Sequence, residues 1–175
     1  YNLDLRMMGA ECCRRTYAEK SRGADIAVVE GVMGLFDGGD ASTAALAKVL
    51  SLPVLLVVDA GSAAESAAAV VQGFQHFDSE LNIRHVVFNN IGSSRHRQLI
   101  HQAVTTHCSL DYAGYFGRDV KYRIPERHLG LHMGSEQPLG QEGLDHLVAA
   151  VEESLDLDTI TSLYPQESEE QQNGE

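Results

Sequence analysis

Apolar residues along the chain gather in four short runs, and the segments between them have helical spacing. The runs are "DIAVVE" (25–30), "PVLLVVDA" (53–60), "IRHVVFNN" (83–90) and the weaker "LDYAGYF" (110–116). Each run has the length of a strand, and strands that are apolar on both faces are typical of a covered parallel sheet. Apolar spacing predicts helices before, between and after these strands, at 9–22, 42–51, 62–76, 94–107 and 140–155.

The alternation of strands and helices predicts an α/β fold, with a mostly parallel sheet covered by helices on both faces. Ser42, Ser62 and Ser94 stand where helices would start, and a serine there can accept a hydrogen bond from an orphan amide. The chain changes character at Pro165, where an acidic, Gln-rich stretch without an apolar face begins. We therefore expect one domain over residues 1–163 and an acidic linker over 164–175.

Composition and charge narrow the choice of partner. The chain has 175 residues, 43% of them hydrophobic and 6% aromatic, which is typical of one globular domain. Its net charge is −12, but eight acids and no Lys or Arg lie in 152–175, so 13 basic and 17 acidic residues remain elsewhere. Without a cluster of basic residues, nucleic acid is not the expected main partner, and a small molecule fits better.

The three cysteines and the apolar runs bear on the compartment. Cys12, Cys13 and Cys108 have the spacing of neither a disulfide framework nor a CxxC site, which favours a reducing, cytoplasmic environment. No apolar run approaches the roughly 20 residues that span a bilayer, so no membrane partner is expected. The start, "YNLDLRMMG", has no signal pattern and no initiating Met, and we expect that an upstream segment has been removed.

Polar residues at the ends of the predicted strands are the first candidates for chemistry, because ligands of open α/β sheets bind at the carboxyl ends of strands. Glu30 follows the first run, Asp59 the second, and Asn89 and Asn90 end the third. An acid at a strand end is often only a cap or a loop residue in water, and Asp59 shows no sign of more. Glu30 follows four apolar residues, so we expect its carboxylate to be partly buried and to need a partner such as a divalent cation.

The stretch "EGVMGLFDGG" (30–39) adds four glycines and Asp37 to Glu30. Glycines let the backbone approach a ligand closely or adopt positive φ, although they also occur in loops that bind nothing. These residues predict a metal or phosphate site, with an ordinary glycine-rich turn as the alternative. The chain contains no GxxxxGK[ST] loop, no GxGxxG after a strand and no HExxH, so a complete nucleotide site is not readable from it.

Two further segments concentrate polar residues. In "YRIPERHLGLHMGSE" (122–136), Arg127 and His128 are an anion-binding pair by type, and a solvated loop with incidental charges is an equal alternative. In "NNIGSSRH" (89–96), side-chain amides could read a base edge through paired donors and acceptors. A turn before a helix would explain the same residues.

Five motifs occur together and in order: "NLD", "EGVMGLFDG", "STAALAKVLSLPVLLVVDA", "NNIGSSRH" and "IPERHLGL". This combination resembles the synthetase domain of cobyrinic acid a,c-diamide synthases, a corrinoid-amidating family of cobalamin biosynthesis. The resemblance covers nearly all of residues 2–163 and implies a P-loop NTPase fold, a three-layer sandwich like that of dethiobiotin synthetase.

Other families remain as alternatives to this resemblance. Cobyric acid synthase and dethiobiotin synthetase share the fold, but "IPERHLGL" favours the a,c-diamide enzymes. A ParA-like ATPase switch would need basic residues on a late helix, and 140–155 has no Lys or Arg. A regulatory domain without catalysis also stays open, because a fold does not fix a function.

The resemblance implies a ligase that depends on ATP and Mg²⁺. Such an enzyme activates the a and c side-chain carboxylates of cobyrinate or hydrogenobyrinate as acyl phosphates, and ammonia released from glutamine displaces the phosphate. The family's P-loop segment and its glutamine amidotransferase domain have no counterpart in the chain. We therefore expect an internal piece of a longer protein, inactive alone because phosphate positioning and charge neutralisation carry most of phosphoryl-transfer catalysis.

The resemblance also assigns roles to individual residues. Glu30 matches the acid expected at the Mg²⁺ site, and Asn89 matches the amide expected to read adenine. The loop 31–39 with Asp37, which we also expect to be catalytic, matches a segment expected near the corrinoid and the transferred phosphate. In dethiobiotin synthetase a helix N-terminus holds the substrate carboxylate across a dimer, which implies a homodimer and a substrate contact at the corresponding segment. That segment contains Ser62 and Ser66. The other expected substrate-binding residues, Ser42, Thr43, Arg127 and His128, match segments expected near the corrinoid and the transferred phosphate.

One residue departs from the family pattern. A Gly-x-x-Pro-Arg run usually precedes "PERHLGL", whereas this chain has "GYFGR", with Gly117 in place of the proline. We expect the adenine-side loop over 115–118 to be looser than in the family.

Overall fold

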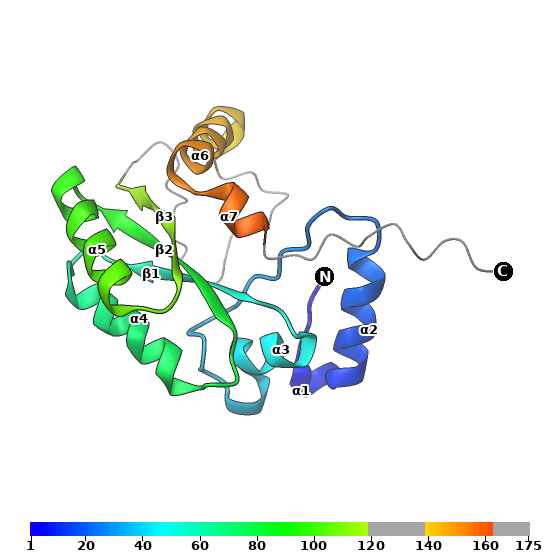
Figure 1. Ribbon diagram of the computed structural model, residues 1–175. Helices are drawn as coiled ribbons and strands as arrows, with labels where there is room; N and C mark the ends of the chain where they lie inside the picture. Colours follow the sequence, from blue (N-terminus) through cyan, green and yellow to red (C-terminus); the bar gives the residue numbers. More distant parts are fainter. Residues whose placement is uncertain (119–138, 163–175) are drawn as a thin grey trace, which may run out of the picture. The chain divides into compact units, whose positions relative to one another are not determined.

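The computed structural model describes residues 1–118 and 139–162, which form two compact units (Figure 1). The first unit contains residues 1–54, 78–83 and the described residues from 158 onward. The second contains residues 55–77 and the described part of 84–157. The predicted linker at 164–175 and the candidates Arg127 and His128 lie outside the described residues, so the predicted domain boundary stays a prediction.

The second unit is built on a three-stranded sheet, β1 (Val54–Asp59), β2 (Ile83–Ile91) and β3 (Asp111–Gly117), with β2 in the centre. The Val54 amide bonds to the Asn82 carbonyl at 2.8 Å and the Ala60 amide to the Asn89 carbonyl at 3.0 Å, so β1 and β2 run in the same direction. β2 and β3 also pair in parallel. The predicted α/β fold with a parallel sheet is confirmed.

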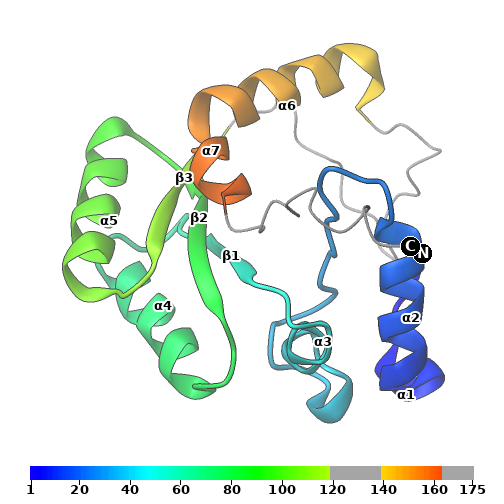
Figure 2. The same cartoon turned by 45° about the vertical axis from the view of Figure 1, so that its right-hand side comes forward.

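Helices cover this sheet from two sides. α4 (Ser66–Phe77) and α5 (Ser94–His107) form the crossovers and pack side by side on one face, while α6 (Gly140–Ser154) follows β3 on the other (Figures 1 and 2). The central strand is accordingly buried on both faces, with Val86, Val87 and Phe88 at most 1% exposed. No helix in the described part of the chain is long and apolar enough to cross a membrane.

The first unit is mainly helical and contains α1 (Leu5–Met8), α2 (Ala10–Ser21), the short 3-10 helix η1 (Gly39–Ala41) and α3 (Thr43–Leu50). The predicted helix at 9–22 is preceded by α1, whose N-cap Asp4 accepts hydrogen bonds from the Arg6 and Met7 amides. Gly9, with φ of 75°, separates α1 from α2. A last helix, α7 (Leu157–Thr161), was not predicted, and its residues from Asp158 onward belong to the first unit.

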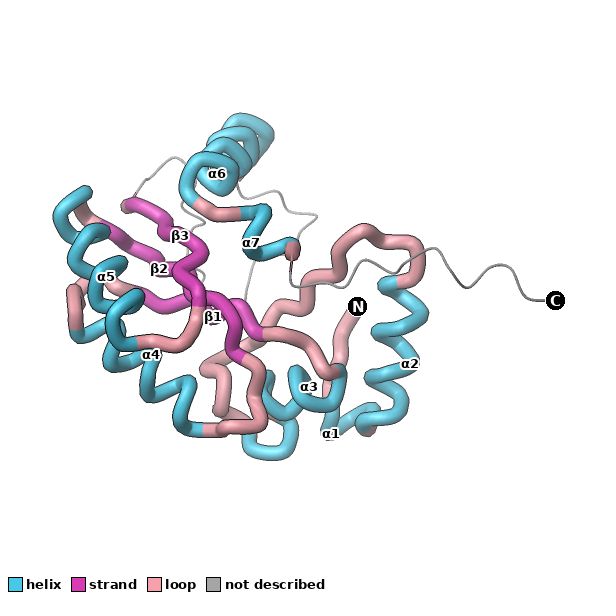
Figure 3. The backbone as a smooth tube through the Cα atoms, in the orientation of Figure 1, coloured by secondary structure: helices cyan, strands magenta, loops and turns pink. Residues whose placement is uncertain are grey.

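The strand predicted at 25–30 is wrong. The segment is drawn as loop in Figure 3, and its apolar side chains remain open to water, with Val28 87% exposed. A strand exists only where a neighbour receives its backbone hydrogen bonds, and no described strand pairs with this segment. Glu30 therefore does not end a strand, and its expected partial burial is also wrong because the residue is exposed.

Two predicted helix starts need correction. α4 begins at Ser66 and not at Ser62, because tight turns come first: the Ala63 amide bonds to the Ala60 carbonyl and the Ala67 amide to the Ala64 carbonyl. α5 has the predicted bounds, but Ser93 caps it in place of Ser94, accepting from the His96 amide at 3.1 Å. The predicted cap at Ser42 is confirmed.

Candidate functional site

The four glycines in the loop after Glu30 differ in what surrounds them and in their backbone conformation. A Cβ on Gly31 would lie 2.6 Å from Thr43 Cγ2, and one on Gly34 would overlap the Asp37 carboxylate. Gly38 and Gly39 have φ of 105° and 59°, values that favour glycine. Gly31 and Gly34 thus leave room for the side chains of Thr43 and Asp37, and Gly38 and Gly39 adopt left-handed backbone conformations. The loop therefore has a defined backbone structure.

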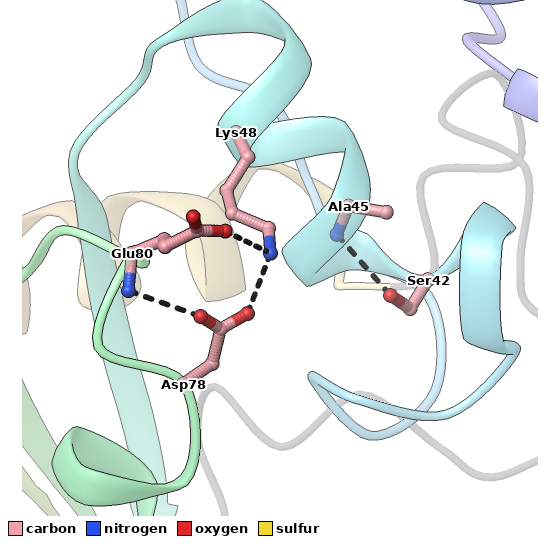
Figure 4. A network of polar contacts seen from close by, with 5 residues as sticks. All are labelled: Ser42, Ala45, Lys48, Asp78 and Glu80. Carbon is pink, nitrogen blue, oxygen red and sulfur yellow. Dashed lines mark hydrogen bonds and ion pairs between the residues drawn. The ribbon is translucent and has the colours of Figure 1, made fainter.

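This loop closes onto the start of α3. The Ala44 amide donates to the Leu35 carbonyl at 2.9 Å, and Ser42 Oγ accepts from the Ala45 amide at 3.2 Å (Figure 4). Ser42 is only 6% exposed and Thr43 packs against Gly31. Both side chains therefore hold the loop against the helix. For Ser42, which was predicted to bind substrate, the structure describes a capping role.

The other end of α3 is held by an ion-pair network. Lys48 Nζ lies 2.6 Å from Asp78 Oδ2 and 3.4 Å from Glu80 Oε2, and Asp78 Oδ1 accepts from the Glu80 amide at 3.0 Å (Figure 4). The hydrogen bond between Lys48 and Asp78 raises the pKa of Lys48 and lowers the pKa of Asp78. These groups are partly exposed, so solvent screens both ion pairs and each adds little to the stability. Together with the Ser42 cap they fix both ends of the helix on which the loop rests.

Of the two acids predicted to be catalytic, Glu30 lies directly before this loop and Asp37 lies within it. Asp37 folds over Gly34, and its amide donates to the Gly34 carbonyl at 3.0 Å. Glu30 is exposed and forms no ion pair within the described residues, where no group of three or more His, Cys, Asp or Glu could enclose a metal ion. Mg²⁺ is usually held by one or two carboxylates together with water and substrate phosphates. An open Glu30 carboxylate fits that donor set.

The second unit has a polar cluster at the carboxyl end of its sheet, made of Asp59, Asn90 and Arg118. Asp59 Oδ1 accepts from the Gly61 amide at 2.7 Å, and the Asn90 side chain donates to the same carboxylate. These two hydrogen bonds, and then the nearby Arg118 charge, lower the pKa of Asp59. Asn90 itself has φ of 64°, a conformation that Asn tolerates better than most residues.

Arg118 ties the ends of all three strands together. Its guanidinium donates to the Gly61 carbonyl and, through Nε, to the Asn90 carbonyl at 3.3 Å. Its amide donates to the Ile91 carbonyl, also at 3.3 Å. Sequence reasoning gave Asp59 no role beyond a loop acid and assigned none to Arg118. Asp59 lies near the end of the run 53–60 and Arg118 two residues after the run 110–116, but neither position shows what the side chain contacts.

The remaining predicted residues of the second unit lie near the same sheet end. Asn89 is exposed, its Oδ1 accepts from the Asn90 amide at 2.9 Å, and its side-chain NH₂ is left as a donor. Ser62 and Ser66 are exposed in the turn before α4 and at its first residue. His96 holds this turn, because Nε2 donates to the Ala63 carbonyl at 2.6 Å while Nδ1 accepts from the Gly92 amide at 3.2 Å.

Comparison with known proteins finds relatives that are named a,c-diamide synthases. The chain is 42% identical over 167 residues to the cobyrinate a,c-diamide synthase of Salmonella typhimurium and 37% over 166 residues to that of Caldanaerobacter subterraneus. It is 38% identical over 168 residues to the hydrogenobyrinate a,c-diamide synthase of Agrobacterium fabrum. Each alignment covers 93% of the chain and 36%, 37% and 38% of the respective relative.

The chain thus spans little more than a third of the length of these curated relatives. No family model matches the chain, and no solved structure matches it. The relatives align over nearly all of the region on which the motifs were recognised. The resemblance read from those motifs is confirmed: the chain is a homologue of one segment of the cobyrinate and hydrogenobyrinate a,c-diamide synthases.

Proposed function

We propose that the full-length protein carrying this chain converts the a and c side-chain carboxylates of cobyrinate or hydrogenobyrinate into amides, using ATP and Mg²⁺, with glutamine as the nitrogen source. The observation that carries the proposal is 37–42% identity, over 93% of the chain, to synthases named for these two substrates. Because the chain spans about a third of such proteins, phosphate binding and ammonia release are assigned to parts outside it, and the chain alone is expected to be inactive.

Within the first unit, Glu30 and Asp37 are the acids to which this proposal gives a role. When bound, Mg²⁺ would neutralise charge on the transferred phosphate. Glu30 holds the ion, and its exposed, unpaired carboxylate supports that role. Asp37 faces the substrate side, and the capped, anchored α3 keeps both acids on a fixed loop.

Within the second unit, the proposal concerns Asn89 and the turn before α4. Asn89 reads adenine with its free NH₂ donors, while the turn with Ser62 and Ser66 offers hydroxyls and amides to a carboxylate or phosphate. A homodimer, in which this turn serves the neighbouring subunit, is part of the same proposal. Arg127 and His128 are proposed to bind an anionic group, and they lie outside the described residues.

The alternatives are less well supported. Cobyric acid synthase and dethiobiotin synthetase are disfavoured by the names that recur among the relatives. A ParA-like switch that binds DNA is disfavoured because α6, the late helix of the described chain, carries no Lys or Arg.

The test uses the full-length protein with cobyrinate and with hydrogenobyrinate, each with MgATP and glutamine, and mass spectrometry of the macrocycle. We expect diamide from one or both substrates. Absence of amide with both macrocycles would refute the proposed function.

A variant pair tests the metal role separately. Glu30→Gln should lower kcat/KM by about 100-fold or more and raise the Mg²⁺ concentration needed for half-maximal rate. The control Glu11→Gln, on an exposed face of α2 where Glu11 meets Arg14 at 3.6 Å, should stay within about twofold of wild type. Unchanged turnover and Mg²⁺ dependence in Glu30→Gln would show that Glu30 does not hold the metal.

A further inference from the structure

Arg118 makes contacts that a ligand-binding arginine would not be expected to make. Its side chain reaches two main-chain carbonyls, that of Gly61 in the turn after β1 and that of Asn90 near the end of β2. Main-chain carbonyls belong to the backbone itself, so these contacts join the backbones of the turn after β1 and the end of β2. The planar guanidinium can donate in two directions at once, which a lysine ammonium on its flexible stem does not reproduce.

The loops joined by Arg118 carry residues with proposed roles. The turn after β1 contains Ser62 and leads to Ser66, and the end of β2 contains Asn89. Asn89 Oδ1 accepts from the Asn90 amide, so the orientation of the Asn89 side chain is tied to the peptide bond between Asn89 and Asn90. Arg118 binds the carbonyl of that same residue.

A second tie connects the same two loops from another element. His96, in the first turn of α5, bridges the Ala63 carbonyl and the Gly92 amide. Asp59 adds a third, since it accepts from the Gly61 amide and the Asn90 side chain. Three side chains therefore hold the turn after β1 to the end of β2. They are Asp59 at the end of β1, His96 in α5, and Arg118 directly after β3.

We propose that Arg118 is a positioning residue for the nucleotide: it fixes Asn89 and the turn at 61–66 relative to one another without contacting the nucleotide. The inference rests on the proposed function, because it takes Asn89 as the adenine contact. It also gives a role to the arginine that follows Gly117, where the proline of the family run is missing. With that proline absent, Arg118 is the described side chain that holds the end of β3 to its neighbours.

Loss of the guanidinium should weaken ATP binding and leave the chemical step nearly intact. In Arg118→Ala the Gly61 and Asn90 carbonyls accept hydrogen bonds from water in place of the guanidinium, because both contacts are exposed. The turn after β1 and the end of β2 then sample more conformations. We expect KM for ATP to rise about tenfold with kcat within about twofold, the pattern of lost uniform binding. Arg118→Lys should behave like Arg118→Ala, and added guanidinium ion should partly restore KM in Arg118→Ala but not in Arg118→Lys.

The experiment measures these parameters on the full-length protein together with hydrogen exchange in the absence of ligand. Amides of residues 61–66 and 89–92 should exchange faster in both Arg118 variants. They should not do so in the control Arg84→Ala, which removes an exposed arginine from the opposite end of β2.

Unchanged exchange together with unchanged KM would overturn the inference. A loss of kcat at constant KM would also overturn it, because Arg118 would then act in the chemical step. If the wild-type protein forms no amide, the proposed function fails. The exchange measurement then still decides whether Arg118 holds the two loops.

Discussion

Gly114 in β3 permits the closest packing in the second unit, and its replacement by alanine is the sharpest stability test. The residue has φ of 134° and forms an antiparallel bridge with Leu155, just beyond α6, next to a 2.9 Å hydrogen bond from the Asp156 amide to the Ala113 carbonyl. A Cβ on Gly114 would overlap the Ser154 carbonyl oxygen and lie 2.9 Å from Leu155 Cα. These are backbone atoms, so rotation of a side chain cannot relieve the contact.

The cost of Gly114→Ala can be worked out from these contacts. The backbone conformation costs a non-glycine residue about 1–3 kcal/mol, and overpacking adds about 1–3 kcal/mol unless α6 moves away. Moving α6 would break the bond to Ala113, at about 1 kcal/mol. We therefore expect a loss of about 3 kcal/mol or more in the free energy of unfolding, which for a chain of this size lowers Tm by roughly 6–12 °C.

Thermal melting followed by circular dichroism checks this expectation, with Gly73→Ala as the matched control. Gly73 lies in α4, where an added Cβ meets no atom within 4 Å, so alanine there should stabilise the chain by about 0.5–1 kcal/mol. If Gly114→Ala melted within about 1 °C of wild type, the packing of α6 on β3 described above would be incorrect.

Three further changes probe single features by urea unfolding. His85 is 1% exposed, neither of its ring nitrogens is hydrogen-bonded within the described residues, and burial lowers its pKa. Because the unfolded chain therefore binds a proton at this residue more readily than the folded chain, the free energy of unfolding should fall as the pH drops below about 6.5. His85→Leu should remove that part of the loss without lowering the free energy of unfolding at about pH 7.5. Ser42→Ala should cost about 1 kcal/mol by removing the α3 cap, whereas exposed Ser79→Ala should cost nothing measurable. Tyr112→Phe should be neutral or stabilising, because the Tyr112 hydroxyl is buried without a hydrogen-bond partner among the described residues, and burial raises its pKa to about 12. A loss above about 1 kcal/mol in the free energy of unfolding would show that the hydroxyl has a hydrogen-bond partner.

The parts of the fold that depend on local pattern were predictable from the sequence. α5 has the predicted bounds, and three of four predicted strands form within one or two residues of their predicted ends. The strand at 25–30 failed because apolar content alone does not form a strand. A pairing partner is required, and the sequence does not show which segment supplies one.

The site was only partly predictable for a similar reason. The glycines after Glu30 marked an unusual loop, but the pattern could not separate closeness to a ligand from closeness to Thr43 and Asp37. Arg118 contacts residues 57 and 28 positions away in the sequence, so no local spacing points to it. Its role became visible only when the strand ends were placed side by side.

The most direct test of the central claim follows oxygen from the substrate. The account holds that ATP activates a corrinoid carboxylate as an acyl phosphate before ammonia attacks. With macrocycle labelled by ¹⁸O in its side-chain carboxylates, the full-length protein should transfer one label to inorganic phosphate for each amide formed. Amide formation without ¹⁸O in the phosphate, or without a requirement for ATP, would contradict the account.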